Sequence, residues 1–212
     1  MEMIPSNIKN IIFDFGAVIY DIDADRTVQA FKALQITEFD SFHDFLSSHT
    51  NETLFIDIET GKISPAEFRD TIRTWSKHKL SDKTIDFAWN AMLVGYVKER
   101  LDLLCELKTK YRTFLLSNTN IIHWEYFTTQ LKEFGFSGLD EFFEKDYYSH
   151  DLKMRKPDLD IFKYVLNDSN LIARETLFLD DNLKNIEAAQ MAGIPSIQIT
   201  SELDLLTVFG KK

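Results

Sequence analysis

The sequence predicts an α/β protein: a doubly wound, Rossmann-like parallel sheet with an α-helical cap domain inserted after the first strand. Downstream of about residue 95, short apolar strands alternate with helical stretches. Between residues 20 and 96 the pattern is almost entirely helical. A chain of 212 residues has room for such a core and a modest second domain. We therefore assign residues 1–19 and 97–212 to the catalytic core and residues 20–96 to the cap.

The first strand ends in a carboxylate. Ile11, Ile12 and Phe13 form an apolar run typical of a buried parallel strand, and Asp14 follows directly. Gly16, two residues later, allows the backbone to approach a ligand closely. A buried carboxylate is costly unless something compensates it, and open α/β sheets bind ligands at the carboxyl ends of their strands. Asp14 is therefore a candidate functional residue.

A second acidic group follows another apolar strand. Residues 176–179 are such a strand, and Asp180 and Asp181 come next. Two acidic groups at strand ends indicate one shared cation, with Asp14 free to act as a nucleophile beside it.

The other core elements follow from apolar periodicity. Gly135 is a plausible C-cap for one helix, and Pro157 precedes the start of another. The expected helices cover residues 98–110, 121–134, 158–166 and 182–191, and the expected strands cover 113–116, 147–148, 176–179 and 196–199.

The segment assigned to the cap shows little strand patterning. Ser64 and Glu67 flank Pro65 as a capping box, which fixes one helix start. Because the segment follows Asp14 so closely, we expect it to form a lid above that residue. The expected cap helices cover residues 25–34, 39–47, 65–75 and 82–93.

The amino-acid composition indicates which classes of binding partner to expect. With 34 acids against 24 bases the net charge is −10, which disfavours nucleic-acid binding. No apolar run is long enough for a membrane helix, and the first residues lack signal-peptide features, so we expect a cytoplasmic protein without membrane contact. The single cysteine, Cys105, excludes an internal disulfide, and we expect it to be a buried structural thiol. The sequence gives no indication of oligomeric state.

Four ordered motifs resemble those of the haloacid dehalogenase-like superfamily, in the subfamily with a helical cap after the first motif. The resemblance covers essentially the whole chain and extends to bacterial sugar-phosphate phosphatases. Each motif alone is weak, but the ordered set is specific. The matching segments are Phe13-Asp14-Phe15-Gly16-Ala17-Val18, Leu115-Leu116-Ser117-Asn118, Met154-Arg155-Lys156-Pro157-Asp158, and Asp180-Asp181 with Asn185 and Ala188-Ala189.

The resemblance implies a Mg²⁺-dependent phosphatase that hydrolyses a small phosphorylated metabolite, with sugar phosphates among the candidates. Asp14 would attack phosphorus and form an aspartyl phosphate. Asp14, the Gly16 carbonyl and Asp181 would hold Mg²⁺, and Asp180 would be a further ligand or would orient Asp181.

The remaining expected roles concern the phosphate. Ser117 and Lys156 would assist catalysis together with Asp14, and both would also bind the phosphate. Gly16 and Asn118 complete the expected substrate-binding set.

One position departs from the pattern of most phosphatases in the superfamily. Gly16 stands where they carry a second aspartate that acts as general acid and base, help typically worth about 10²–10⁴-fold. Two alternatives therefore stay open. One is a metal-independent 2-haloacid dehalogenase, which the doubled acid of Asp180 and Asp181 fits poorly. The other is a catalytically silent phosphate-binding member of the family.

Several other residues have two interpretations. Asp23 and Arg26 could contact substrate or belong to a solvated helix, and Trp89 or Asn90 could face the substrate or lie in the cap core. Ser117 could also cap the following helix. Asn185 is expected to be a polar group on a helix surface. His123 and His150 are expected to be surface or capping residues.

Overall fold

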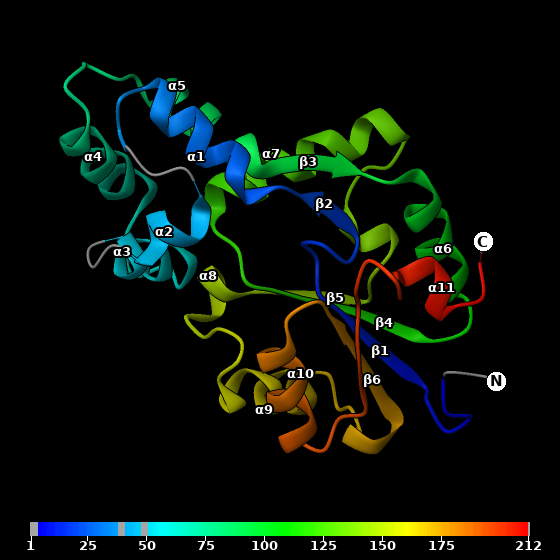
Figure 1. Cartoon of the computed structure of the whole chain (residues 1–212). Helices are drawn as coiled ribbons and strands as arrows, with labels where there is room; N and C mark the ends of the chain where they lie inside the picture. Colours follow the sequence, from blue (N-terminus) through cyan, green and yellow to red (C-terminus); the bar gives the residue numbers. More distant parts are fainter. Residues whose placement is uncertain (1–3, 38–40, 48–50, 212) are drawn as a thin grey trace.

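The computed structural model describes residues 4–37, 41–47 and 51–211 (Figure 1). Its core is a five-stranded, fully parallel sheet in the order β5-β4-β1-β6-β7. This architecture confirms the predicted fold class. The strands are β1 (Asn10–Phe13), β4 (Arg112–Ser117), β5 (Lys145–Tyr148), β6 (Thr176–Asp180) and β7 (Ser196–Gln198).

Helices cover both faces of the sheet (Figure 1). On one face Ile12 packs with residues of α9 and α10, whereas its neighbours Ile11 and Phe13 belong to the cluster that includes α6 and α7. This alternation along β1 explains why the strand is apolar throughout. The longer core helices are α6 (Lys98–Lys108), α7 (Ile121–Gln130), α9 (Leu159–Asp168) and α10 (Leu183–Met191), and the short ones are α8 (Ser149–Leu152) and α11 (Leu205–Val208).

Between β1 and α6 the described residues form five α-helices and a two-stranded antiparallel ribbon of β2 and β3 that connects them to the core. The ribbon begins at Tyr20 and ends at Tyr96. The elements are β2 (Tyr20–Ile22), α1 (Ala24–Ala33), α2 (Phe42–Ser47), α3 (Asn51–Glu59), α4 (Pro65–Trp75), α5 (Asp82–Trp89) and β3 (Leu93–Tyr96). A helix over residues 39–47 was expected, but residues 39 and 40 lie outside the described part of the chain.

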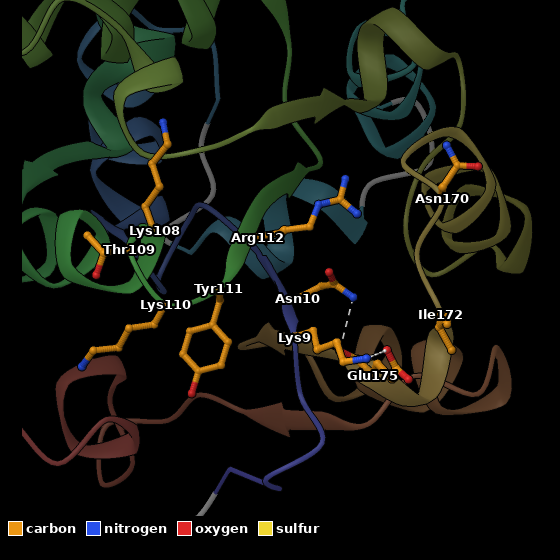
Figure 2. Close-up of a pocket in the computed structure, with 10 residues that line it drawn as sticks. All are labelled: Lys9, Asn10, Lys108, Thr109, Lys110, Tyr111, Arg112, Asn170, Ile172 and Glu175. Atoms are coloured by element: carbon orange, nitrogen blue, oxygen red, sulfur yellow. Dashed lines mark hydrogen bonds and ion pairs between the residues drawn. The ribbon is translucent and has the colours of Figure 1, made fainter.

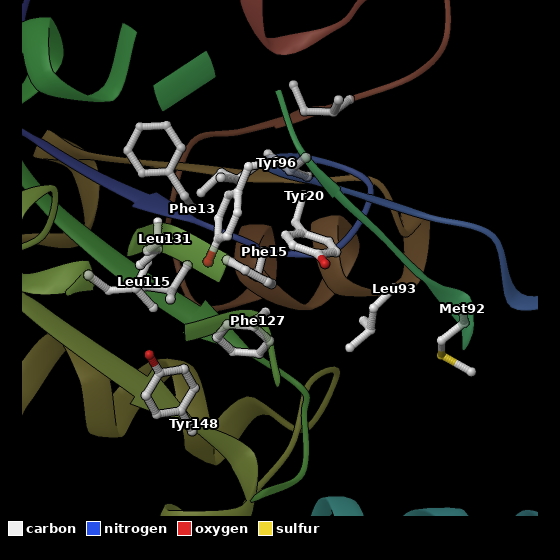
Figure 3. Packing of buried hydrophobic residues seen from close by; sticks show 14 of the residues in the cluster. Phe13, Phe15, Tyr20, Met92, Leu93, Tyr96, Leu115, Phe127, Leu131 and Tyr148 are labelled. Atoms are coloured by element: carbon white, nitrogen blue, oxygen red, sulfur yellow. The ribbon is translucent and has the colours of Figure 1, made fainter. Parts of the chain in front are cut away.

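An aromatic cluster joins the ribbon to the core (Figure 3). The rings of Phe15 and Phe127 lie 4.3 Å apart between centroids, and those of Tyr20 and Tyr96 lie 4.7 Å apart in an edge-on contact. Phe15 also stacks on Tyr20. The division into a core of residues 1–19 and 97–212 and a cap of residues 20–96 stays a prediction, and these contacts show that both ends of the cap segment are anchored in the core.

Three sequence expectations for the cap were wrong. The ribbon was not expected, since its strands are only three and four residues long. Helix α3 was missed because its apolar residues fit the period of a strand as well as that of a helix. The α-helix expected over residues 82–93 ends at Trp89 and continues as a 3-10 helix over Asn90–Met92, where the Thr27 hydroxyl donates to the Trp89 carbonyl at 2.9 Å and accepts the Met92 N–H at 3.1 Å.

Cys105 is exposed, not buried as expected. The buried face of α6 is formed by Leu101, Leu104 and Leu107, with Leu103 beside it. Cys105 follows Leu104 by one position and therefore turns away from this face. Among the described residues, no helix is sufficiently long and apolar to cross a membrane.

Candidate active site

The polar residues singled out from the sequence gather at the carboxyl ends of the central strands. Asp14 follows β1, Ser117 is the last residue of β4, and Asp180 is the last residue of β6. Lys156 comes from the loop before α9. Parallel pairing in register brings these positions together, since Phe13 of β1 pairs with both Leu115 and Leu179.

Lys156 lies between two carboxylates. Its Nζ is 2.5 Å from Asp14 Oδ1 and 2.7 Å from Asp180 Oδ2. The Lys156 side chain is 1% exposed and that of Asp180 is 0% exposed. A buried ammonium is tolerated only with such partners, and the arrangement fixes its position relative to Asp14.

Asp180 is held from several sides. Its Oδ1 accepts the backbone N–H of Asn182 at 2.8 Å, and the Asn185 amide donates to both of its carboxylate oxygens at 3.0 and 3.1 Å. Asn185 is buried, so the expectation of a helix-surface group was wrong. These bonds leave the Asp180 carboxylate a single orientation, in which Oδ2 faces Lys156.

The side chain of Asn118 holds the backbone of Lys156. Asn118 Nδ2 donates to the Lys156 carbonyl, and the Lys156 N–H donates to Asn118 Oδ1, both at 2.9 Å. Such a reciprocal pair fixes the loop as well as the lysine that it carries. Asn118 also lines a cavity at the carboxyl ends of the strands, and its role in binding substrate stays a prediction. Its side-chain amide, however, is engaged by the protein.

Asp14, Asp180 and Asp181 form a group of acids suited to a metal ion. Each offers a carboxylate oxygen, and these oxygens all lie within 4.8 Å of one another. Three carboxylates against the single ammonium of Lys156 leave an excess of negative charge. A divalent cation with hard oxygen preference, such as Mg²⁺, would offset that excess. Ala17 in the preceding loop adopts a left-handed conformation at φ 59°, which turns the chain just after Gly16.

The pKa values of Asp14 and Lys156 reflect this crowding of charged groups. Burial raises the pKa of Asp14 to about 7, against the opposing effect of the Lys156 ammonium, and the nearby Asp180 and Asp181 carboxylates add to the increase. Burial by itself would lower the pKa of Lys156, but Asp14 and Asp180 outweigh it and the net shift is upward. Lys156 is therefore positively charged at neutral pH.

A cavity of about 330 Å³ adjoins the strand ends. Its core side includes Gly16, Ser117, Asn118 and Thr119, and its cap side includes residues of α3 and the end of α5. Residues of the helical segment thus line one side of this cavity, and the role of the segment as a lid stays a prediction. The remaining lining residues are Phe15, Ile22, Ala24, Phe55, Ile56, Glu59, Trp89, Met92, Leu93, His123, Phe127 and Arg155.

Two charged residues that line the cavity were not predicted from the sequence to be functional. Glu59 is the last residue of α3, a helix that was not expected, and Arg155 stands next to the motif lysine but was given no role. Trp89 does line the cavity, whereas Asp23 and Arg26 are exposed and lie outside its lining. The one sequence signal for these two residues was Arg155 itself, a basic residue without an expected role that stands next to Lys156.

The cap helix α3 meets the core at a glycine. Gly61, just after α3, has φ 60°, and a Cβ built on it would lie 2.3 Å from the carbonyl oxygen of His150 in α8. Only glycine combines this conformation with this approach. The His150 ring in turn contacts the Thr119 carbonyl through Nδ1 at 3.1 Å.

His123 is buried, contrary to the expectation of a surface or capping histidine. Its ring stacks on Trp89 with 4.6 Å between centroids, and its Nε2 is 3.3 Å from the Trp89 carbonyl oxygen. Burial lowers the pKa of His123 to about 4, so the ring is neutral at neutral pH. The cap of α7 is supplied by Asn120, whose side chain accepts the His123 N–H, and not by Ser117.

A family model described as haloacid dehalogenase-like hydrolase matches residues 11–199. The match covers the sheet, the cap segment and all the motif residues above. The chain belongs to this family of hydrolases.

Individual proteins and solved structures of this family are similar to nearly the whole chain. A D-ribitol-5-phosphate phosphatase from Bacteroides thetaiotaomicron is 35% identical over 195 residues, covering 90% of this chain and 91% of the relative. The crystal structure of a haloacid dehalogenase family enzyme from the same organism matches with a TM-score of 0.89 and 37% identity over 96% of this chain and 99% of that one. A wild-type structure of such an enzyme in complex with magnesium and inorganic phosphate matches with a TM-score of 0.84 and 37% identity, covering 95% and 99% of the two chains.

Proposed function

We propose that this protein is a Mg²⁺-dependent phosphatase that hydrolyses the phosphate monoester of a small metabolite through an aspartyl phosphate on Asp14. The observation that carries the proposal is the placement of Lys156 between Asp14 and Asp180, with Asp181 completing a group of acids suited to a cation. The relative named as a phosphatase and the related structure with magnesium and phosphate support it.

In the first half of the reaction an Asp14 carboxylate oxygen attacks phosphorus. The new Asp14 Oδ–P bond forms as the bond from phosphorus to the leaving oxygen breaks. Lys156 neutralises charge on Asp14 and on the phosphate, and the Ser117 hydroxyl at the end of β4 donates to a phosphate oxygen. Asn118 contributes by holding Lys156 in place.

Asp14, Asp181 and the Gly16 carbonyl would hold Mg²⁺, which supplies charge that screens the approach of two anions. Asp180 is engaged by Lys156, Asn182 and Asn185, so its better-supported role is to orient the site. In the second half, water attacks phosphorus, the Asp14–P bond breaks and inorganic phosphate leaves.

Position 16 is a glycine, so no carboxylic acid there can donate a proton to the leaving oxygen. The rate should therefore rise as the leaving group becomes more acidic, and aryl phosphates should be cleaved faster than alkyl phosphates. Gly16 has no left-handed backbone, but a Cβ there would lie 3.3 Å from Cδ1 of Ile22, which is closer than ordinary van der Waals contact. The Ile22 side chain must therefore shift slightly before a side chain fits at position 16.

A panel of phosphorylated metabolites with Mg²⁺ or EDTA, assayed by phosphate release, tests the proposal. We expect Mg²⁺-dependent release, with sugar-alcohol and sugar monophosphates the first class to examine because of the relative's name. Release of halide from 2-haloacids without metal, or binding of phosphate with no turnover of any ester, would contradict the proposal. A cytoplasmic location stays a prediction.

A further inference from the structure

The cavity lined by Gly16, Ser117 and Asn118 also contains an ion pair that the proposed chemistry does not use. Glu59 at the end of α3 and Arg155 in the core loop meet across the cavity lining, with 3.4 Å between Oε2 and Nη2. Each side chain is about one-third exposed or less. The pair joins the cap to the residue immediately before Lys156, so it lies beside the reaction centre without being part of it.

Both charged groups retain hydrogen-bonding capacity. A carboxylate accepts about four hydrogen bonds and a guanidinium donates five. Their mutual contact is long, and Arg155 Nε is buried with no hydrogen-bond partner in the described part of the chain. Buried polar groups left in this state cost free energy, which a ligand that offers both donors and acceptors recovers. Hydroxyl groups have this property, because each can donate to Glu59 and accept from Arg155.

The rest of the lining restricts the ligand further. Phe55 and Trp89 stack with 4.9 Å between ring centroids, and both line the cavity with Ile56 and Met92. Apolar walls with a few placed polar groups are usual for small-molecule sites, and about 330 Å³ is at the lower end of the roughly 300–1,000 Å³ that such sites span. This space suits a small organic group.

The charge of the pair excludes a second anion. Arg155 is already neutralised by Glu59, and the Glu59 carboxylate repels any further phosphate or carboxylate on the substrate. Partial burial raises the pKa of Glu59 against the opposing effect of Arg155, consistent with a group that lacks sufficient partners.

Resting on the proposed function, we infer that Glu59 and Arg155 are the specificity-determining residues for the organic part of the substrate. They bind its hydroxyl groups, so the substrate is the monophosphate of a small, polyhydroxylated and otherwise uncharged molecule. A deoxygenated or doubly phosphorylated compound of similar length is discriminated against.

Three phosphate esters test the inference in the complete protein with Mg²⁺: D-ribitol 5-phosphate, pentane-1,5-diol monophosphate, which lacks the internal hydroxyls, and p-nitrophenyl phosphate. We expect the wild type to prefer ribitol phosphate to the diol phosphate by about 100-fold or more in kcat/KM. Glu59→Gln should lower kcat/KM for ribitol phosphate by about 10- to 100-fold and leave the other two esters unchanged.

Two further variants complete the design. Asp57→Asn removes a carboxylate from the same helix outside the cavity lining, where Asp57 pairs with Lys62, and should behave as the wild type. Arg155→Gln should lose the same preference as Glu59→Gln, and the double variant should lose little more. Because Glu59→Gln frees Arg155 to bind an anion, it should also gain activity on a pentose 1,5-bisphosphate.

The outcomes separate the inference from the function on which it rests. Equal losses on all three esters in Glu59→Gln would assign the pair to folding or catalysis and overturn the inference. Wild-type hydrolysis of p-nitrophenyl phosphate with no preference for hydroxyl groups would overturn it while leaving the phosphatase function intact. Failure of the wild type on every ester, p-nitrophenyl phosphate included, would instead refute the phosphatase function.

Discussion

The two ends of the sheet both gather basic residues around a cavity, and they use them differently. At the amino end Lys9, Lys110 and Arg112 line a cavity of about 410 Å³ together with Tyr111 and Lys108 (Figure 2). Lys9 pairs with Glu175 at 2.8 Å. Two further pairs join Lys110 to Glu106 and Arg112 to Glu144.

At the carboxyl end Lys156 differs from these surface groups. Lys156 is buried and contacts two carboxylates, whereas Lys9, Lys110 and Arg112 are each more than two-fifths exposed. Exposed ion pairs contribute about 0–1 kcal/mol because water solvates both partners. A buried ammonium loses that solvation and requires partners fixed in position. The comparison teaches that burial, more than the number of charged residues, distinguishes the candidate active site from the charged surface at the amino end of the sheet.

The largest expected effect concerns the proposed nucleophile. Asp14→Asn replaces a carboxylate with a nearly isosteric amide that is a poor nucleophile, so phosphate release should fall by roughly 10³-fold or more with the fold retained. Steady-state phosphate release and circular dichroism of the purified variant check this. A variant that keeps a tenth of the wild-type rate would rule out the covalent mechanism.

The second prediction compares the two ends of the sheet by the free energy of unfolding of a variant at each end. Lys156→Met leaves Asp14 and Asp180 without their cation and should lower the free energy of unfolding of the metal-free protein by about 3–5 kcal/mol. Arg112→Met at the amino end should cost about 1 kcal/mol or less, because its pair with Glu144 is exposed. Urea denaturation measures both. Equal losses in the two variants would refute the distinction.

A third effect concerns the metal. A cation that binds only the folded protein stabilises it by about 2.7 kcal/mol at a hundred times its Kd. Asp181→Ala removes one of the three clustered carboxylates and should lose most of the Mg²⁺-induced increase in melting temperature. Glu202→Ala, which removes an exposed acid outside this cluster, is the matched control. A full Mg²⁺ shift in Asp181→Ala would exclude Asp181 as a ligand.

The smallest expected effect is the pH dependence of stability caused by His123, a buried and neutral side chain. The pKa of His123 falls from 6.5 to about 4 in the folded protein, so its contribution to stability is complete above pH 6.5 and is lost as the pH falls toward 4. At pH 5 the loss should be about 2 kcal/mol. His123→Phe should reduce this acid sensitivity and His78→Phe, at an exposed position, should not. Urea titrations at pH 7.5 and 5 decide, and identical acid sensitivity in wild type and His123→Phe would contradict this account.

Much of the site was predictable because strand ends are visible in the sequence. Asp14 and Asp180 each follow an apolar run, and parallel pairing then brings them together without further information. Lys156 was predictable only through its motif, since nothing local indicates that a lysine before a proline is buried.

The contacts that depend on tertiary placement could not be predicted. The hydrogen bonds between the Asn118 side chain and the Lys156 backbone join positions 38 residues apart. The ion pair of Glu59 and Arg155 joins positions 96 residues apart. Helix α3, which carries Glu59, was missed because its periodicity is ambiguous. Cys105 was misplaced by one position on α6, which suffices to turn a side chain from core to solvent.

The central claim is that Asp14 carries the phosphoryl group between two half-reactions. Rapid quenching of the enzyme with Mg²⁺ and a ³²P-labelled phosphate ester tests it most directly, followed by peptide mapping of the protein-bound label. We expect a hydroxylamine-sensitive acyl phosphate on the peptide that contains Asp14, and none in Asp14→Asn. Steady turnover with no label on the protein at any quench time, or label on a different peptide, would contradict the claim.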